Sequence, residues 1–428
     1  MKKRFLVTVF ATSVAALVMA QGGTSSPYSQ FGLGVLSDQS QGFNRGMNGV
    51  GLGLRKGNIV NTLNPASYSA IDSLTMIFDM GFSGKLTNFE EGRVKQNVSK
   101  ADFEYAVGSF RLFPHVGVSF GLLPYSNVGY EYATSNYLSE QNITVAESYV
   151  GSGGLHQAFV GAGWRVLKPL SVGVNIAYLW GNYKRSVTTS SSDNSLRTLS
   201  KVYSASVNSY NLDLGLQWQQ KLSKKDELTL GATLGVGHKL GADPSCSIMI
   251  ADTQTGVSDT TALTAPNGLS IPLSYGVGLS WAHSDKLLVA ADVLVQKWGS
   301  VDFPAYIESN NTYATQPGLL MDRYRVNVGM DYVPGAMSRR LLNRIHYRCG
   351  AGYATPYCKI NGKDGPKEFS VSAGFGIPLQ NSYNNRSVLN ISAKWGRTSA
   401  TDLITENVFS INIGMTFNER WFAKWKID

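Results

Sequence analysis

The sequence has little charge and few cysteines, and both shortages exclude classes of protein. Asp, Glu, Lys and Arg make up only 16% of the 428 residues, whereas soluble globular proteins usually carry about a quarter. The three cysteines, Cys246, Cys349 and Cys358, are too few and odd in number for an exported disulfide scaffold. Cys349 and Cys358 flank a predicted strand-to-loop corner, and the sequence neither predicts nor excludes a disulfide between them. No Cys or His spacing typical of a metal site occurs, so we predict neither a metal nor another cofactor.

Sequence motifs of catalysis are also missing. There is no H-E-x-x-H, Walker loop or G-x-S-x-G, and the Gly-rich residues 151–154 lack the strand and helix that phosphate binding requires. His156 and His238 lie near predicted external strand ends, where a barrel lipase needs a Ser–His pair, but surface or interface histidines explain both. We therefore predict that the protein is not an enzyme. The net charge of +9 is mild and the Lys and Arg residues are scattered, so we predict no nucleic-acid partner.

Long apolar runs are confined to the N-terminus. Lys2, Lys3 and Arg4 precede an apolar run at residues 5–18, and residues 18–20 are small or aliphatic. This order is typical of a secretory signal peptide, and we predict one at residues 1–20 with cleavage at about Gln21. No Cys lies at the cleavage point, which argues against a lipoprotein anchor. No other stretch approaches the length of a membrane-spanning helix, so none is predicted in the mature chain.

A glycine-rich segment at residues 42–72 separates the N-terminus from the rest of the chain. Gly46 and Gly49 belong to a run too rich in Gly for a stable helix, because each interior Gly costs about 0.5–1 kcal/mol relative to Ala. Asn64, Pro65 and Ala66 end the run in a turn, since Pro fixes its own φ and moves the preceding residue out of the α region. Residues 21–72 are therefore predicted to form an N-terminal extension and a hatch, a plug folded inside a barrel. A glycine-rich tether that ends in a turn is the alternative.

From residue 73 onward the sequence alternates between apolar and polar residues with the period of a β-strand. In the last such segment Phe409 and Ile411 share one face, and Ser410 and Asn412 share the other. Polar rows of this kind would lie unpaired in the dry core of a soluble β-sandwich, which is the alternative fold. The predicted fold class is all-β: a transmembrane antiparallel β-barrel of about 14 strands over residues 73–418. The predicted strands are 74–89, 102–113, 116–132, 155–166, 170–184, 210–221, 227–240, 271–283, 286–299, 324–333, 344–355, 368–379, 387–397 and 408–417.

The predicted connections alternate between short and long. Outer-membrane barrels have short periplasmic turns and longer external loops, so we predict the outer membrane of a Gram-negative bacterium, with both termini periplasmic. Residues 419–428 then form a periplasmic C-terminal tail. The short connections are 113–114, 167–169, 222–226 and 284–285, and the long ones are 133–154, 185–209, 241–270, 300–321 and 356–367.

The glycine-rich run and the Asn64-Pro65-Ala66 turn resemble the N-terminal hatch of the FadL family of outer-membrane long-chain fatty-acid transporters. Residues 170–174, 271–279 and 290–299 resemble strand patterns of that family, and the short C-terminal tail resembles its Bacteroidetes-type members. The resemblance implies fourteen strands with a hatch, and a hydrophobic ligand that leaves sideways through a gap at a kink in the third strand. Leu123, Pro124 and Tyr125 lie in the middle of the third predicted strand here. Because Pro cannot donate to the sheet ladder, a local break at this point is physically reasonable, and a bend without an opening is the alternative.

Three inward-facing basic residues are candidate contacts for a ligand in the lumen. By parity, Arg165, Arg325 and Lys394 face inward, where each can pair with a fatty-acid carboxylate through charge-assisted hydrogen bonds. Three carboxylates, of Asp213, Asp292 and Asp331, face inward as well. Ion pairs that only fill space are therefore the alternative for each basic residue.

These observations predict a passive channel that takes up small hydrophobic molecules such as long-chain fatty acids, gated by the hatch. The expected partners are outer-membrane lipid and a hydrophobic small-molecule ligand. The alternative is a structural or partner subunit of an outer-membrane secretion or assembly complex, which binds another outer-membrane protein. A transporter should have an apolar pocket between hatch and loops, whereas a subunit can have a filled lumen. The Ser/Thr-rich external loops at 188–200 and 253–264 are predicted to be flexible rather than to cover a ligand.

Overall fold

The structure is a computed structural model that describes residues 23–193, 195–379 and 387–420. The predicted signal peptide at residues 1–20 and nearly all of the predicted tail at 419–428 lie outside the described residues. No helix among the described residues is long and apolar enough to cross a membrane.

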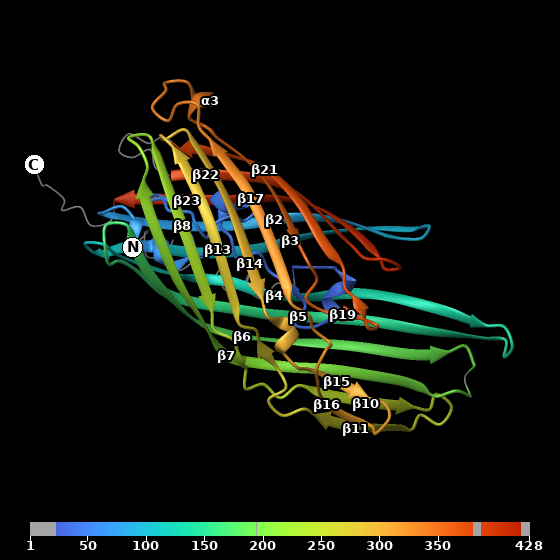
Figure 1. Ribbon diagram of the computed structural model, residues 1–428. Coiled ribbons are helices and arrows are strands. Elements are labelled where there is room, and N and C mark those ends of the chain that lie inside the picture. Colours follow the sequence, from blue (N-terminus) through green and yellow to red (C-terminus); the bar gives the residue numbers. More distant parts are fainter. Residues whose placement is uncertain (1–22, 194, 380–386, 421–428) are drawn as a thin grey trace, which may run out of the picture.

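Fourteen antiparallel strands close into one barrel, which confirms the predicted fold class (Figure 1). Each strand pairs with the next along the chain, and the last, β23, pairs with the first, β2, over sixteen residue pairs. The barrel strands are β2 (Thr75–Glu91), β3 (Val94–Phe113), β4 (Val116–Leu138), β5 (Ile143–Arg165), β6 (Leu170–Ser191), β7 (Thr198–Lys221), β8 (Asp226–Gly235), β13 (Ser274–His283), β14 (Leu287–Gln296), β17 (Arg323–Tyr332), β18 (His346–Ala354), β21 (Lys367–Leu379), β22 (Ser387–Ser399) and β23 (Thr405–Arg420).

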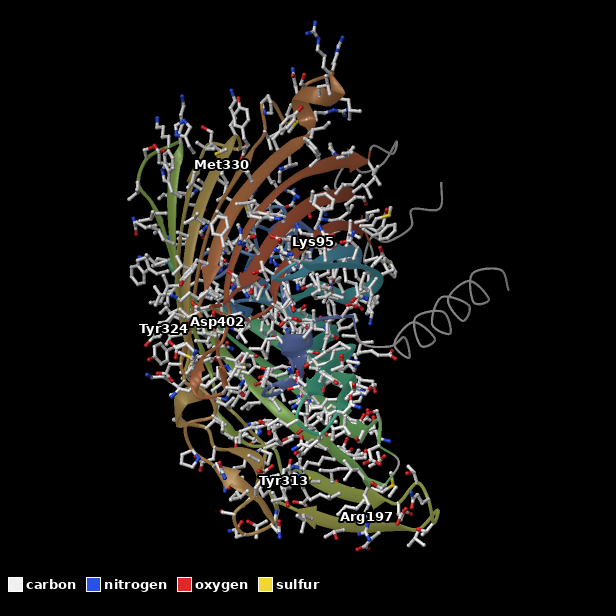
Figure 2. All side chains as sticks on the ribbon, turned by 90° about the vertical axis from the view of Figure 1, so that its right-hand side faces the viewer. Lys95, Arg197, Tyr313, Tyr324, Met330 and Asp402 are labelled. Carbon is white, nitrogen blue, oxygen red and sulfur yellow. The ribbon has the colours of Figure 1, made fainter. Side chains whose placement is uncertain are left out.

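The two faces of the barrel wall differ in chemistry. In β17 the outward Tyr324 and Val328 are 46% and 48% exposed, whereas the inward Asn327 and Asp331 are 5% and 2% exposed. Figure 2 labels Tyr324 and Met330 of this outer row. An exposed belt of aliphatic and aromatic side chains around a closed barrel is what a lipid bilayer requires. The polar inner row is buried because other parts of the chain fill the lumen.

The connections divide the barrel into a short-turn end and a long-loop end. At the short-turn end, residues 114–115, 166–169, 222–225 and 284–286 join neighbouring strands. A longer connection at this end, residues 333–345, contains α3 (Leu341–Arg344). The long-loop end carries η3 (Trp298–Ser300), the hairpin of β15 (Phe303–Ile307) and β16 (Thr312–Gln316), the pair β9 (His238–Lys239) and β12 (Ser270–Ile271), and the pair β19 (Lys359–Ile360) and β20 (Lys363–Asp364).

Two of the predicted long loops are wrong, because they are strands that continue past the barrel. Residues 133–154 belong to β4 and β5 apart from the four-residue turn 139–142, and residues 185–209 belong largely to β6 and β7. Two further strands, β10 (Ser245–Ala251) and β11 (Ser258–Thr264), extend this sheet, since β10 pairs with β7 where β8 no longer does. Of the segments predicted to be flexible loops, residues 188–191 belong to β6, residues 198–200 to β7 and residues 258–264 to β11. Outside the bilayer a strand needs no apolar outer row, so its sequence lacks the alternation on which the prediction relied.

The N-terminal part of the described chain lies inside the ring of strands (Figure 1). We call residues 23–39 the strap and residues 40–72 the hatch. The strap contains η1 (Pro27–Gln30) and β1 (Val35–Leu36), and the hatch contains α2 (Gly42–Arg45) and η2 (Pro65–Ala70). Apolar hatch residues such as Met47, Val50 and Leu54 are completely buried.

Inward glycines of the barrel wall let the hatch backbone approach closely. A Cβ atom on Gly173 of β6 would lie 2.3 Å from the carbonyl carbon of Pro65, and one on Gly215 of β7 would lie 2.2 Å from Oδ1 of Asn64. No real Cβ tolerates such distances, so these positions require Gly while η2 stays in place. The lumen is therefore filled by direct contact between the hatch and the wall.

Candidate functional site

The ladder between β3 and β4 stops partway along the barrel. Pairing runs from Phe113 and Val116 at the short-turn end to Ala106 and Leu122, and no β3 residue before Ala106 pairs with β4 in the described chain. The next residues of β4 are Leu123, Pro124 and Tyr125, with a bulge opposite β5 between Pro124 and Ser126. Beyond this point β3 stays with β2 while β4 stays with β5, and the two pairs diverge toward the long-loop end (Figure 1). We call this interruption the ladder break.

The strap takes the place of β3 along the open edge of β4. Val35 pairs with Asn127 and Leu36 with Ser126. On one side of these pairs, the amide of Ser37 donates to the carbonyl of Tyr125 at 3.0 Å, and Nε2 of Gln39 donates to the carbonyl of Pro124 at 2.7 Å.

On the other side, a hydroxyl replaces a backbone partner. Oγ of Ser29 donates to the carbonyl of Gly129 at 3.3 Å and accepts from the amide of Gly129 at 3.1 Å. An unpaired strand edge leaves donors and acceptors without partners. The strap therefore satisfies the edge of β4 from Pro124 to Gly129.

The far end of the strap is held by β2, β3 and β23. Lys100 donates to the carbonyl of Thr24 at 2.8 Å, and Lys85 donates to the carbonyl of Gly23 at 3.4 Å. Oγ of Ser26 donates to Glu406 at 2.6 Å. The strap thus contacts strands on both sides of the ladder break. Only two of its residues, Val35 and Leu36, form regular backbone pairs with β4.

A cavity of about 290 Å³ lies between the strap and the barrel wall. Its lining includes Lys100 and Glu104 of β3 and Asn127 of β4, so it is located at the ladder break. The charged lining residues are Asp38, Arg45, Lys85, Lys100, Glu104, Arg323, Arg325, Glu368, Lys394 and Glu406. Basic groups exceed acidic ones in this set, and apolar side chains such as Leu36, Val98 and Val408 lie among them.

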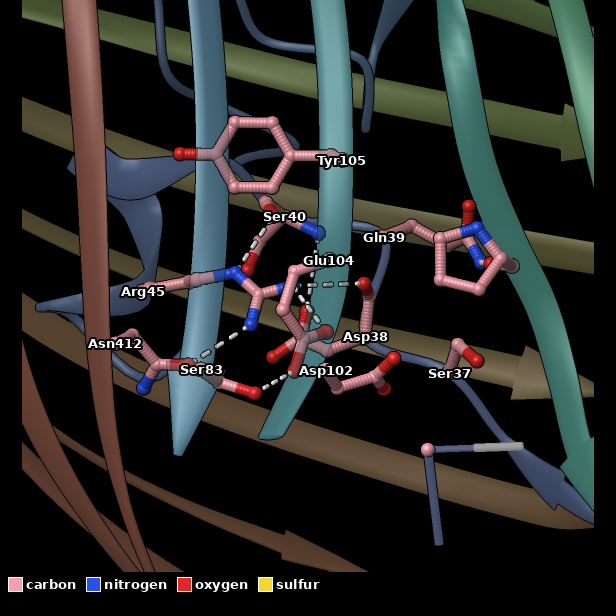
Figure 3. A network of polar contacts seen from close by, with 12 residues as sticks. Ser37, Asp38, Gln39, Ser40, Arg45, Ser83, Asp102, Glu104, Tyr105 and Asn412 are labelled. Atoms are coloured by element: carbon pink, nitrogen blue, oxygen red, sulfur yellow. Dashed lines mark hydrogen bonds and ion pairs between the residues drawn. The ribbon is translucent and has the colours of Figure 1, made fainter. Parts of the chain in front are cut away.

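Arg45 of the hatch anchors one wall of the cavity (Figure 3). Its Nη2 pairs with Glu104 at 3.1 Å, its Nη1 donates to Asn412 at 3.1 Å, and its Nε donates to the carbonyl of Ser40 at 3.0 Å. Ser83 and Lys85 also bond to Glu104. This network satisfies a guanidinium and a carboxylate that are both almost fully buried.

The carboxyl of Asp38 at the end of the strap lies among basic residues. Burial alone would raise its pKa, but Arg45, Arg325 and Lys394 and the hydrogen bond from Ser40 outweigh burial and hold the pKa well below its usual range. Asp38 therefore stays ionised and partly neutralises the basic side of the cavity. A ligand anion bound there has to compete with it.

A second cluster ties the hatch to the wall near the short-turn end. Asp331 accepts from Lys56 at 3.1 Å, from Nδ1 of His346 at 3.0 Å and from Nε of Arg348 at 3.0 Å. The ring of Phe43 lies 4.6 Å from Nζ of Lys56 and 4.1 Å from the guanidinium carbon of Arg348. We call these five residues the latch. It joins α2 and the loop after it to β17 and β18.

The predicted ligand contacts separate into two groups. Arg325 and Lys394 line the same cavity, whereas Arg165 lies at the short-turn end of β5 and is absent from the cavity lining. Arg325 also has a protein partner, because its guanidinium lies beside the side-chain amide of Asn327, whose oxygen accepts from it once the amide is turned over. Lys394 lies 3.8 Å from Glu368, which also pairs with Arg323 at 3.5 Å.

The predicted hatch residues lie in the lumen. Gly46 follows α2 against the side chain of Arg348, and Gly49 has a φ of +78°, which L residues rarely adopt. Asn64 caps η2 by accepting from the amide of Ala66 at 3.1 Å, and Pro65 is the first residue of η2.

Sequence reasoning missed the role of the strap. One signal was available: Asp38 and Arg45 are the only charged residues between positions 21 and 54. Isolated charges in such a neutral segment suggest specific partners. The three cysteines are free, so the bridge between Cys349 and Cys358 is not formed. Among the described residues no cluster of His, Cys, Asp and Glu is suited to hold a metal.

Solved structures share this architecture. The toluene transporter TbuX of Ralstonia pickettii has 14% sequence identity and a TM-score of 0.60, over 89% of this chain and 98% of that one. The toluene transporter TodX of Pseudomonas putida has 16% identity and a TM-score of 0.60, over 91% and 100%. A FadL homologue of Pseudomonas aeruginosa has 12% identity and a TM-score of 0.57, over 90% and 98%. At such identities the likeness shows the fold alone.

The barrel with its lipid-facing belt has the fold of FadL-like outer-membrane proteins, so the predicted resemblance is confirmed at the level of the fold. The family profile described as BamG matches residues 1–428, and the chain belongs to the BamG family. No curated protein matches the sequence. The likeness to Bacteroidetes-type members stays a prediction.

Proposed function

We propose that the protein is a passive channel for small amphipathic molecules with an apolar body and an acidic head group, of which long-chain fatty acids are the natural example. The observation that carries this proposal is the cavity at the ladder break, where Arg325 and Lys394 meet apolar side chains. The ligand enters from the long-loop end and leaves through the break into the bilayer. Both termini then face the periplasm.

The straight route through the lumen is the less favourable one. The hatch is in direct contact with inward glycines of β6 and β7, and the latch adds a buried carboxylate with three partners. Moving the hatch would expose the buried charges of the latch, which costs free energy. The strap has only two residues in regular pairing with β4. Within the strap, Val35 is 37% exposed and Leu36 is only partly buried, unlike Leu33 of the same segment. Less buried segments open more easily, so we infer that this part of the strap, rather than the hatch, gates the side route.

A disulfide between strap and wall tests the side route. Val35 and Asn127 are direct partners that both line the cavity, and paired antiparallel residues have the Cα separation that a disulfide needs. Val35→Cys with Asn127→Cys is made in a chain whose three native cysteines are changed to Ser. We expect oxidation to lower fatty-acid uptake into cells at least about tenfold, and reduction to restore it.

The control pair is Val118→Cys with Ala162→Cys, which are partners in the continuous ladder between β4 and β5. Its oxidation should leave uptake unchanged. Equal uptake with the strap locked and unlocked would exclude the side route.

The head-group preference is tested with the basic residues of the cavity. Arg325→Gln and Lys394→Gln should each raise the half-saturating concentration of a fatty acid about tenfold, because a hydrogen bond to a charged group contributes about 1.5–3 kcal/mol. The matching fatty alcohol should respond much less. Arg165→Gln is the matched control, since Arg165 lies outside the cavity lining. Equal responses to acid and alcohol would contradict the acidic head group.

A second function, that of a subunit in an outer-membrane protein complex, is favoured by the sheet that projects past the barrel. The paired ends of β5, β6, β7, β10 and β11 present a wide surface away from the bilayer (Figure 1). Assignment to the BamG family is compatible with this role. Native mass spectrometry of gently extracted protein separates the two functions: a bound lipid supports the channel, and a stoichiometric protein partner with an empty cavity supports the subunit.

A further inference from the structure

The connection between β17 and β18 stands out from the other turns at its end of the barrel. Residues 333–345 make thirteen residues, whereas the other connections described at the short-turn end have two to four. The connection carries α3 beyond the neighbouring turns, away from the barrel (Figures 1 and 2). We call it the α3 projection. The cavity does not explain it, because none of its residues lines the cavity.

Hydrogen bonds within the α3 projection hold its shape. The amide of Gly335 donates to the carbonyl of Asn343 at 2.8 Å, which closes the loop at its base. Oγ of Ser338 accepts from the amide of Arg340 and from Nδ2 of Asn343, each at 3.2 Å. The hydroxyl of Tyr347 in β18 donates to the carbonyl of Leu342 at 3.0 Å. A preorganised loop loses less conformational entropy when it binds a partner.

The surface of the α3 projection combines large apolar side chains with arginines. Met337 is 99% exposed, Leu342 68% and Leu341 47%. Arg339, Arg340 and Arg344 accompany them, and residues 333–345 contain no Asp or Glu. No ion pair of these three arginines is found among the described residues. Exposed apolar side chains beside arginine are typical of the centre of a protein interface.

The direction of the α3 projection indicates whether a lipid bilayer or a protein covers its apolar side chains. The exposed apolar rows lie on the barrel strands, and the α3 projection continues past the ends of these strands (Figure 2). Its apolar side chains therefore reach beyond the membrane boundary, where a bilayer cannot cover them. Arginine guanidinium groups pair with carboxylates in a bidentate geometry. Charge complementarity thus selects an acidic protein surface.

We propose that the α3 projection is a docking element for a periplasmic protein domain with an acidic surface around an apolar pocket. Met337 and Leu342 enter the pocket, and Arg339 and Arg340 pair with carboxylates at its rim. The periplasmic side follows from the short turns, which are typical of that side in outer-membrane barrels. This docking is independent of the proposed transport, since none of the residues of the α3 projection lines the cavity between the strap and the barrel wall.

Site-specific photo-crosslinking in cells tests the docking. The full-length protein carries a photoreactive amino acid in place of Met337, and a control carries it in place of Lys224 in the turn between β7 and β8 at the same end. We expect one protein adduct from position 337 and none from position 224. Mass spectrometry of the adduct should place the crosslink beside Asp or Glu residues.

Charge reversal completes the test. Arg339→Glu with Arg340→Glu should reduce the adduct at least about tenfold, whereas Lys224→Glu with Lys225→Glu should not change it. Gel mobility with and without heating shows whether each variant folds, and Arg339→Ala with Arg340→Ala replaces the reversal if it does not. No adduct, an adduct with phospholipid, or an adduct that survives charge reversal would overturn the proposal. Fatty-acid uptake should be the same in all these variants, so failure here leaves the transport proposal untouched.

Discussion

The side chain of Asn64 joins the hatch to itself and to two barrel strands. Its Oδ1 accepts from the amide of Ala66, and its Nδ2 donates to the carbonyls of Leu52 at 2.8 Å, Leu216 at 3.2 Å and Ala232 at 3.4 Å. The residue is completely buried, so no water replaces these bonds when the amide is removed.

Asn64→Ala should therefore lower the free energy of unfolding by about 1–3 kcal/mol, the usual cost of leaving buried polar groups unpaired. Urea unfolding of protein in lipid vesicles, followed by tryptophan fluorescence, measures the change. Asn310→Ala is the control, because Asn310 lies exposed in the turn between β15 and β16. An equal loss in both variants would mean that the bonds of Asn64 contribute little.

Asp331 is the single carboxylate of the latch, and its charge balances Lys56 and Arg348. Asp331→Asn keeps the shape but leaves the fully buried Arg348 without its anion, which costs about 3–5 kcal/mol for a buried pair. The hatch then loosens from β17 and β18, and proteases should cleave residues 40–72 faster in the variant. Asp302→Asn, at an exposed position, should not alter cleavage. Unchanged cleavage of Asp331→Asn would show that packing alone holds the hatch.

At the scale of elements, β7 pairs with two different strands along its length. Residues 213–221 pair with β8 in the barrel wall, and residues 198–204 pair with β10 in the projecting sheet. The ends of the β10–β11 hairpin are adjacent, since the amide of Ala265 donates to the carbonyl of Pro244 at 2.9 Å. The hairpin can thus be removed without stretching the chain.

Replacement of residues 245–264 by a short Gly-Ser linker should leave the barrel folded, because no pair of the closed wall is lost. The heat-dependent gel mobility that marks folded barrels measures this outcome. The edge of β7 at residues 198–204 becomes exposed, so the variant should self-associate more at high concentration. Loss of the folded mobility would mean that the projecting sheet is needed to close the barrel.

The elements also show what the sequence was able to predict. Alternation with period two is strong wherever one face meets lipid, so the number and order of the barrel strands were predictable from rows such as that of Phe409 and Ile411. The same parity put Arg325 and Lys394 on the inner face, where both line the cavity. The outer ends of β6 and β7 are rich in Ser and Thr, which is why the sequence predicts a loop there.

The strap was beyond prediction for a different reason. Its β1 has two residues, too few to show a period, and its pairing with β4 depends on where the partner β3 departs. Pro124 indicated a disturbance of the ladder but not what would fill the place of β3. Contacts over about a hundred residues of sequence separation, such as that of Ser29 with Gly129, are decided by the fold as a whole.

At the scale of the whole molecule, a fourteen-strand barrel is wide enough to hold an aqueous channel unless the lumen is filled. Here the hatch, the latch and the close approach of Pro65 to Gly173 fill it. Reconstituted wild-type protein in a planar bilayer should therefore carry no steady ionic current. A variant in which a Gly-Ser linker joins residue 39 to residue 72 should open in discrete current steps.

The β10–β11 excision variant serves as control, because it changes the projecting sheet and leaves the hatch in place, so it should remain closed. This comparison separates a lumen blocked by the hatch from one blocked by the structure at the long-loop end. If the wild type conducts as strongly as the variant without the hatch, the filled lumen is not the resting state in a membrane. If only the excision variant conducts, the long-loop end is the barrier and the hatch is not.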